Sequence, residues 1–236
     1  MEQRESITED SSVEQVLAYV REGIINGSFP PQSKLLPKVI AEACGTSFIP
    51  VREALRVLES EGFVTFVHNR GAWVTPLSMD DLDDLYTIRI ELECETLRRA
   101  APFSAAEIRR LERLLTLADK ASRRGDRATV IELNRELHLS IYGKANSPRR
   151  MKLIEQLWLH SARYQRLSLR YRHDAADAEH RLIIEGLARG DHKAAARALK
   201  VHLETTVRLI REGIAPIGRV SEELVDVRQD ASTAST

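Results

Sequence analysis

The chain has 236 residues, of which 43% are hydrophobic, 5% aromatic and 30% charged, and this length suits two modest domains better than one. Its 35 basic and 35 acidic side chains cancel, so any nucleic-acid-binding face must be local and not a property of the whole chain. No run of 18 apolar residues is present, which excludes a membrane-spanning helix.

The chain starts with MEQRESITEDSS, which is polar and acidic and unlike a signal peptide. Its two cysteines, Cys44 and Cys94, are too few for a disulfide framework. We therefore expect the protein to work in the reducing environment of the cytoplasm.

Residues 11–76 are predicted to form a winged helix-turn-helix domain. Apolar residues at helical spacing, together with capping and glycine signals, predict helices over 11–26, 37–44 and 47–61, and a Ser-x-x-Glu capping box opens the first of them. Apolar runs on both sides of Asn69-Arg70-Gly71 predict a β-hairpin. The order helix, helix, turn, helix, hairpin is that of a winged helix-turn-helix.

Residues 77–214 are predicted to form an antiparallel bundle of about six helices, so the fold class is mainly α. Proline, glycine and polar dipeptides separate the helical patterns, which cover residues 78–101, 104–125, 128–143, 148–170, 175–189 and 192–213. The segment 215–236 has little apolar content, and we expect it to be a flexible tail.

The DNA-contacting residues can be proposed from the helix order alone. In a helix-turn-helix the second helix of the motif enters the major groove with its N-terminal residues facing base edges, and here that helix starts near Ser47. The candidates are Lys38, Ser47, Phe48 and Arg52 on the two helices of the motif, and His68 and Arg70 in the hairpin. Taken alone, an arginine such as Arg52 is more often an ordinary surface charge, so it is the combination that favours DNA binding.

A specific resemblance supports this interpretation. The matching residues are Ile25, Gly27, Leu35, Ser47, the run Pro50-Val51-Arg52-Glu53-Ala54-Leu55, Leu58, Glu61-Gly62, Arg70-Gly71 and Val74. In this pattern, residues 12 to about 76 resemble the winged-helix domain of the GntR family of transcriptional regulators. The resemblance implies that Arg52 and Lys38 contact the operator and that His68 and Arg70 belong to the wing.

Two positions depart from the GntR pattern. Phe48 stands where the family usually has a base-reading arginine. The turn that is usually Pro-Gly in the family is Pro31-Gln32 here. Phenylalanine cannot donate a hydrogen bond, but it can contact a thymine methyl group. These departures bear on the operator sequence more than on the activity.

The second half resembles another family. The carrying residues are Arg89, Leu92-Glu93, Asn134 with Leu137-His138, Glu179-His180, Gly190-Asp191, Ala195 and His202-Leu203. With them, residues 78–214 resemble the FCD-type ligand domain of the FadR subfamily. The resemblance implies that a divalent metal ion, Zn²⁺ or Ni²⁺, is held by Asn134, His138, His180 and His202, and that the effector is a small carboxylate metabolite.

The spacing of the histidines agrees with such a site. Asn134 and His138 share one helix face, and His180 and His202 lie at similar heights on either side of the turn at Gly190. Three imidazoles and one oxygen suit Zn²⁺ or a similar metal, although core or surface histidines are the commoner explanation for such residues. The family more often has aspartate at the position of Asn134, which weakens the site and leaves a metal-independent regulator open.

Basic side chains are expected to help bind the effector. Arg89 matches a family position, whereas Arg163 is proposed from helical phase alone, and an arginine in such a position is more often a surface arginine. The prediction is a homodimeric, effector-responsive regulator that binds double-stranded operator DNA, more often a repressor, and not an enzyme. A fatty-acyl sensor of the same subfamily is one alternative. A metalloenzyme on the bundle is another, but it lacks a general base placed as in H-E-x-x-H.

Overall fold

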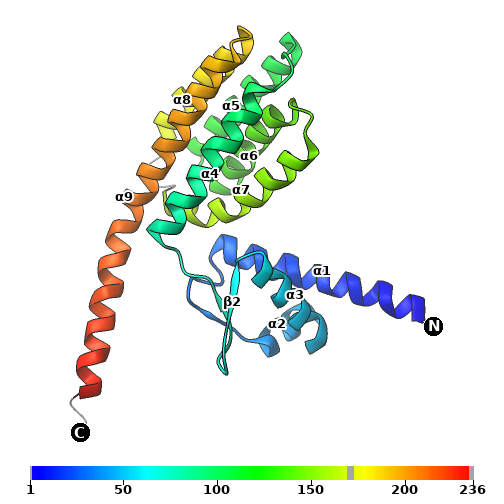
Figure 1. Ribbon diagram of the computed structural model, residues 1–236, viewed down its shortest axis with the longest axis vertical. Helices are drawn as coiled ribbons and strands as arrows, with labels where there is room; N and C mark the ends of the chain where they lie inside the picture. The colour runs from blue at the N-terminus through cyan, green and yellow to red at the C-terminus, as the bar shows by residue number, and fades with distance from the viewer. Residues whose placement is uncertain (1, 169–172, 234–236) are drawn as a thin grey trace. The chain divides into compact units, whose positions relative to one another are not determined.

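The computed structural model describes residues 2–168 and 173–233 and divides the chain into two compact units, residues 1–78 and 79–236 (Figure 1). The boundary follows the end of the predicted hairpin. None of the helices in the described ranges is long and apolar enough to cross a membrane.

The first unit has the predicted order of helices followed by a hairpin. Its elements are α1 (Glu2–Asn26), β1 (Lys34–Leu35), α2 (Pro37–Cys44), α3 (Phe48–Ser60), β2 (Val64–Val67) and β3 (Gly71–Val74). The strands form an antiparallel sheet in the order β1-β3-β2. Strand β1 was not predicted, because two residues are too short to show an alternating pattern. Helix α1 begins at Glu2 instead of near residue 11, since residues 2–10 contain no glycine or proline to stop it.

The core of this unit holds the helix-turn-helix in place. Helices α1 and α3 pack against each other through apolar residues at helical spacing, namely Val16, Val20 and Ile24 of α1 and Val51, Leu55 and Leu58 of α3. Gly45 ends α2 in the left-handed region, with φ of 63°. Ser47 is the N-cap of α3, although its side chain makes no capping hydrogen bond. The first turn of α3 is therefore set by packing and by the glycine turn.

The second unit contains six described helices, as predicted. They are α4 (Met79–Arg98), α5 (Ala105–Arg123), α6 (Arg127–Gly143), α7 (Pro148–Ser168), α8 (His173–Ala188) and α9 (His192–Thr233). The second of them starts with a complete capping box, in which Ser104 and Glu107 bond each other's backbone N–H. Helix α4 packs against α7 and α9, and α5 packs against α6 and α8.

The predicted tail is helical in this structure. Helix α9 continues past residue 214 to Thr233, whereas residues 215–236 were expected to be a flexible tail. The stretch from Ser221 to Arg228 contains glutamate, leucine and arginine, which have high helix propensity. Low apolar content alone was therefore the wrong signal for the local structure of this segment.

Helices α8 and α9 form a close antiparallel pair. A Cβ on Gly186 would lie 2.8 Å from the backbone nitrogen of Ala195, so the two helices approach each other through a glycine. The turn between them includes Gly190, with φ of 70°. This short connection places His180 and His202 side by side, with ring centroids 4.3 Å apart.

Candidate functional site

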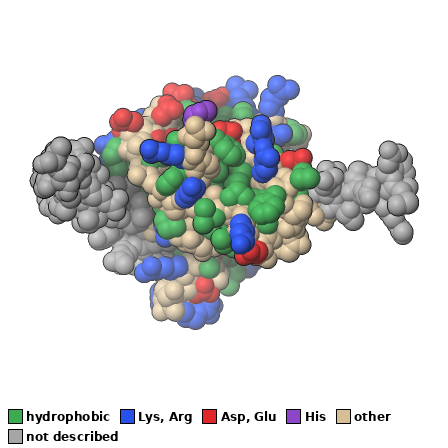
Figure 2. All heavy atoms as spheres, turned by 90° about the horizontal axis from the view of Figure 1, so that it is seen from below, with side chains coloured by type: hydrophobic (Ala, Val, Ile, Leu, Met, Phe, Trp, Pro, Cys, Tyr) green, Lys and Arg blue, Asp and Glu red, His purple; other side chains and the backbone are tan. Residues whose placement is uncertain are grey.

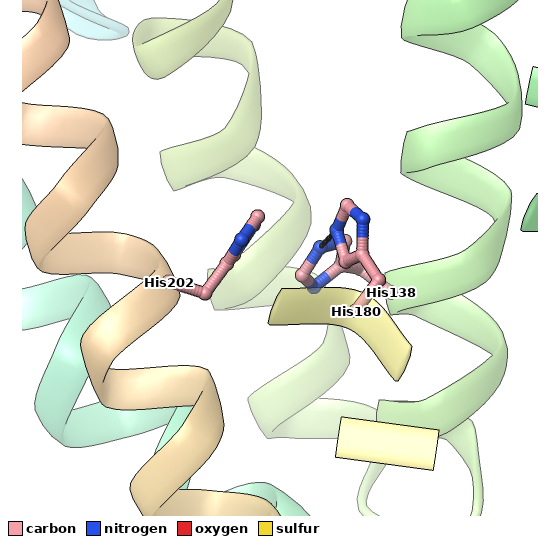
Figure 3. Close-up of side chains that lie close together, drawn as sticks. All are labelled: His138, His180 and His202. Atoms are coloured by element: carbon pink, nitrogen blue, oxygen red, sulfur yellow. Dashed lines mark hydrogen bonds between the residues drawn. The ribbon is translucent and has the colours of Figure 1, made fainter. Parts of the chain in front are cut away.

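Three buried histidines meet inside the bundle. His138 comes from α6, His180 from α8 and His202 from α9, and one ring nitrogen of each lies within 4.8 Å of the others (Figure 3). The three residues are 1%, 5% and 2% exposed, respectively. His138 Nε2 is 3.1 Å from His180 Nε2. The structure thus brings together the three imidazoles that the sequence singled out.

Two hydrogen-bond partners orient these rings. His202 Nδ1 lies 2.9 Å from Glu179 Oε2, in the helix next to it. His138 Nδ1 lies 3.0 Å from the hydroxyl of Tyr142. Metal-binding histidines commonly give their other N–H to a carboxylate or to a similar acceptor, which fixes the ring and its tautomer.

The donor set fits a divalent metal ion. Two nitrogens bound to Zn²⁺ at about 2.0–2.1 Å in tetrahedral geometry lie roughly 3.3 Å apart, close to the 3.1 Å between the Nε2 atoms of His138 and His180. Asn134 is half-buried one turn before His138 on α6. Its part in the site stays a prediction.

A buried ion pair lies next to the histidines. Arg89 Nε donates to Glu93 Oε1 at 2.6 Å. The guanidinium of Arg89 sits 4.7 Å from the ring centroids of both Tyr86 and Trp158, and the Trp158 ring is itself 5.1 Å from His138. Burial alone would lower the pKa of Arg89, but the Glu93 carboxylate raises it above its ordinary value. Arg89 is therefore a permanent positive charge close to the histidine cluster.

Tyr142 connects the ion pair to the histidines. Its hydroxyl donates to Glu93 Oε2 at 2.5 Å and lies within hydrogen-bond distance of His138. Burial, together with the neighbouring Glu93, raises the pKa of this phenol well above its ordinary value. Sequence reasoning missed the roles of Tyr142, Glu179 and Trp158. The i, i+4 spacing of His138 and Tyr142 was a usable signal for one of them.

Arg163, the second predicted effector residue, is buried. It lies on α7 with 4% exposure, and burial lowers its pKa. The alternative that it is an ordinary surface arginine is therefore wrong. Helical phase could not decide this, because both faces of α7 carry long polar side chains.

The predicted DNA-contacting residues are all exposed on the first unit. They are Lys38 on α2, Ser47 and Phe48 at the start of α3, Arg52 one turn later, and His68 and Arg70 in the turn between β2 and β3. Phe48 and its neighbour Ile49 are 55% and 59% exposed. Arg52, Arg56, Glu59 and Phe66 line a shallow hollow of about 260 Å³ between α3 and β2.

The exposed surface mixes apolar and basic groups. Figure 2 shows a face on which hydrophobic side chains gather near the middle, and Lys and Arg side chains lie apart from one another around them. In the first unit the exposed large apolar residues between positions 36 and 67 are Leu36, Val39, Phe48, Ile49, Val57, Phe66 and Val67. A zero net charge thus coexists with local basic positions, as the composition required.

Two protein families match the chain. The family described as "Bacterial regulatory proteins, gntR family" matches residues 12–74, and the FCD domain matches residues 84–205. The first match covers the helix-turn-helix and the wing, and the second covers all three histidines, Arg89 and Glu93.

Several known proteins are similar over most of the chain. The uncharacterized HTH-type transcriptional regulator BphR of Paraburkholderia xenovorans is 27% identical over 213 residues, 86% of each chain. McbR of Escherichia coli is 33% identical over 134 residues, which are 56% of this chain and 61% of McbR. The E. coli repressor GlaR is 25% identical over 209 residues, 84% of this chain and 94% of its own.

Solved structures agree with these relatives. The structure of E. coli McbR/YncC matches with a TM-score of 0.73 and 25% identity, over 85% of this chain and 97% of its own. A putative GntR regulator from Rhodococcus sp. RHA1 matches with a TM-score of 0.72 and 27% identity over the same shares. These relatives are transcriptional regulators and not enzymes, which removes the metalloenzyme alternative. The chain therefore belongs to the GntR family of bacterial regulatory proteins, as a transcriptional regulator that joins a GntR helix-turn-helix domain to an FCD domain.

Proposed function

We propose that this regulator is a homodimeric repressor whose bundle senses a small carboxylate at a metal site and thereby changes its affinity for operator DNA. The observation that carries the sensing part is the position of Arg89. The ring of Trp158 contacts both the buried guanidinium of Arg89 and the imidazole of His138. A fixed positive charge therefore lies close to the set of three imidazoles.

The metal would be held by the Nε2 atoms of the imidazoles. His138 and His202 each point Nδ1 at a hydrogen-bond partner, Tyr142 and Glu179, which leaves Nε2 as the ligating atom in both. A bound divalent ion supplies a Lewis-acid centre to which a carboxylate can bind. Zn²⁺ and Ni²⁺ both suit imidazole ligands, and the amide oxygen of Asn134 is the proposed fourth donor.

Arg89 would bind the effector's negative charge. Its Nη1 atom is buried and makes no hydrogen bond within the described part of the chain, and a buried donor without an acceptor is costly. An oxygen of a carboxylate effector would satisfy that donor through a charge-assisted bond. Arg163, also buried in the bundle, is the second candidate for this role.

The first unit would bind operator DNA through α3 and the wing. Arg52 is the proposed base-contacting residue, Lys38 a phosphate contact, and Ser47 and Phe48 lie at the helix end that enters the major groove. His68 and Arg70 lie at the exposed tip of the β2–β3 hairpin, where a wing contacts the minor groove or the backbone. The name of GlaR as a repressor supports the same sign of regulation here.

The bundle is the proposed site of dimer contact. A groove of about 590 Å³ runs between α4 and α9, with Ile90 and Val207 among its lining residues and with charges of both signs around them. A two-fold interface brings a surface against the same surface of a second copy. The acidic and basic groups of this groove can therefore pair with the opposite charges of the second copy. Val207→Arg would place a charge in the groove, and analytical ultracentrifugation would then show a shift from dimer to monomer.

The sensing proposal can be tested by titrating Zn²⁺ into chelator-treated, full-length protein in a calorimeter. We expect one site per chain in the wild type and none in His138→Ala. The matched control is His192→Ala, because His192 is half-buried in the same unit but outside the cluster. Wild-type protein that takes up no Zn²⁺, Ni²⁺ or Co²⁺, or equal binding by His138→Ala, would overturn the proposed metal site.

A further inference from the structure

A continuous line of hydrogen bonds joins Arg89 to the histidine cluster through Glu93 and Tyr142. Arg89 Nε donates to Glu93 Oε1 at 2.6 Å, Tyr142 Oη donates to Glu93 Oε2 at 2.5 Å, and Tyr142 Oη lies 3.0 Å from His138 Nδ1. All four side chains are buried. The line begins on α4 and ends on α6.

The direction of the Tyr142–Glu93 hydrogen bond determines which group donates in the next bond of this line. A phenol carries one O–H, and Tyr142 gives it to Glu93, the stronger acceptor of its two neighbours. The hydroxyl oxygen can then only accept a hydrogen bond, which the N–H group at His138 Nδ1 donates. A neutral His138 therefore carries its proton on Nδ1 and its lone pair on Nε2, the atom that faces His180 Nε2 at 3.1 Å.

We infer that Tyr142, held by Glu93, is the positioning residue that sets the tautomer and the orientation of His138 for metal binding. This inference rests on the metal site proposed above. Without the Tyr142 hydroxyl, His138 Nδ1 would be a buried donor with this acceptor removed. The other tautomer would then become available, in which Nε2 carries a proton toward His180 and cannot bind metal.

The second oriented histidine shows the same chemistry in a shorter form. His202 Nδ1 meets the carboxylate of Glu179 directly at 2.9 Å, whereas His138 reaches the carboxylate of Glu93 through a phenol. Both arrangements supply an acceptor to Nδ1 and increase the basicity of Nε2. The longer arrangement differs in one respect, because the carboxylate at its far end is also the ion-pair partner of Arg89.

This arrangement ties the effector residue to the metal ligand. Glu93 is shared by Arg89 and Tyr142, so an anion that draws the guanidinium away from Glu93 changes the acceptor that holds Tyr142. Coupling between two bound species is reciprocal. Metal affinity is therefore expected to change when a carboxylate occupies Arg89, and that change is expected to require the Tyr142 hydroxyl.

A purely structural role for Tyr142 makes a different prediction. A tyrosine that only fills the core would affect the stability of the fold but not the affinity for the metal. Tyr142→Phe keeps the ring and removes the hydroxyl. Tyr164→Phe is the matched control, because Tyr164 is also buried in the bundle and its hydroxyl also donates to a carboxylate, that of Asp81, at 2.5 Å.

The test is competition for Zn²⁺ between full-length protein and a chromophoric chelator, with thermal unfolding of the metal-free proteins measured in parallel. We expect Tyr142→Phe to bind Zn²⁺ roughly 10–100-fold more weakly and to shift the visible absorption bands of the Co²⁺ form, while Tyr164→Phe changes neither. Equal Zn²⁺ affinity in wild type and Tyr142→Phe would overturn the positioning role and leave the metal site standing. A wild type that binds no metal would instead overturn the proposed site itself, together with this inference.

Discussion

Arg89 and Glu93 bind each other inside the bundle, with a distance of 2.6 Å between Nε and Oε1 and side chains only 1% and 0% exposed. Removing both charges from water is expensive, and the attraction between them offsets much of that cost. Either residue alone would be an uncompensated buried charge. A substitution of Arg89 or Glu93 alone therefore changes the stability of the bundle as well as any binding by the site.

Arg89→Met should lower the free energy of unfolding of the bundle by about 3–5 kcal/mol, because Glu93 is left buried without its partner. Adding Glu93→Gln should restore most of that loss, whereas the response to effector should be absent in both variants. Urea unfolding followed by Trp158 fluorescence in a Trp73→Phe background reports on the bundle alone. A double variant as unstable as Arg89→Met would show that the lost charge balance is not the cause.

Arg52→Ala should weaken operator binding by roughly 1–3 kcal/mol, the usual contribution of a good base contact. Arg113→Ala is the control, since it removes the same charge from the exposed surface of α5 in the other unit. Fluorescence anisotropy on an operator selected from randomised DNA would measure both. Wild-type affinity in Arg52→Ala would mean that the recognition helix is misplaced.

Phe48 should read thymine methyl groups, because it is 55% exposed at the N-terminus of α3 and cannot donate a hydrogen bond. Replacing operator thymines with uracil should weaken binding by the wild type, and the same replacement should have little effect on Phe48→Ala. The coupling between the two changes isolates the contact. If uracil weakens both proteins equally, Phe48 does not touch those bases. Phe48→Arg should change the preferred operator without unfolding the domain.

His180→Ala should lose bound metal and the response to effector while keeping basal operator binding, because the proposed metal ligands and the proposed DNA-contacting residues lie in separate units. Metal that binds only the folded protein raises the unfolding midpoint of the wild type by mass action. Adding a chelator should remove that rise in the wild type and change nothing in the variant. Elemental analysis with operator titrations would check this, and a wild type that responds to effector without metal would contradict it.

Glu107 provides a pH-dependent contact at the start of α5. Hydrogen bonds from Lys144, and then from Ser104, lower the pKa of Glu107 from 4.5 to about 2. A carboxyl group whose pKa is lower in the folded than in the unfolded protein contributes its full stabilisation at pH values above the unfolded-state pKa. This contribution is lost as the pH falls through the folded-state pKa. Wild type should therefore be more stable than Glu107→Gln at neutral pH.

The difference between these two proteins should shrink as the pH falls from about 4.5 toward 2, the window bounded by the unfolded and folded pKa values. Because the Glu107 side chain is 42% exposed to solvent, the effect should be small and should weaken further with added salt. Thermal unfolding midpoints at a series of pH values would measure it. A pH-independent difference would show that Glu107 acts through its shape and not its charge.

Much of the architecture follows from local signals in the sequence. The capping box at Ser104 and Glu107, the glycines that end helices and the helical spacing of apolar residues depend on neighbours within a turn or two. They correctly predicted six helices after the wing, and they predicted Ser47 as the residue before α3, where it is the N-cap. Local composition was misleading for residues 215–233, which are helical, and two-residue strands such as β1 leave no pattern.

The sites depend on contacts between residues far apart in the chain. Spacing predicted that His180 and His202 lie at one height, because a short turn links their helices, but it could not show that Glu179 orients His202 or that Tyr142 joins His138 to Glu93. Whether Arg163 is buried was likewise open until α7 was packed in the bundle. Helical periodicity specifies which face a residue occupies, whereas only tertiary packing decides which other helix that face meets and which polar groups it must satisfy there.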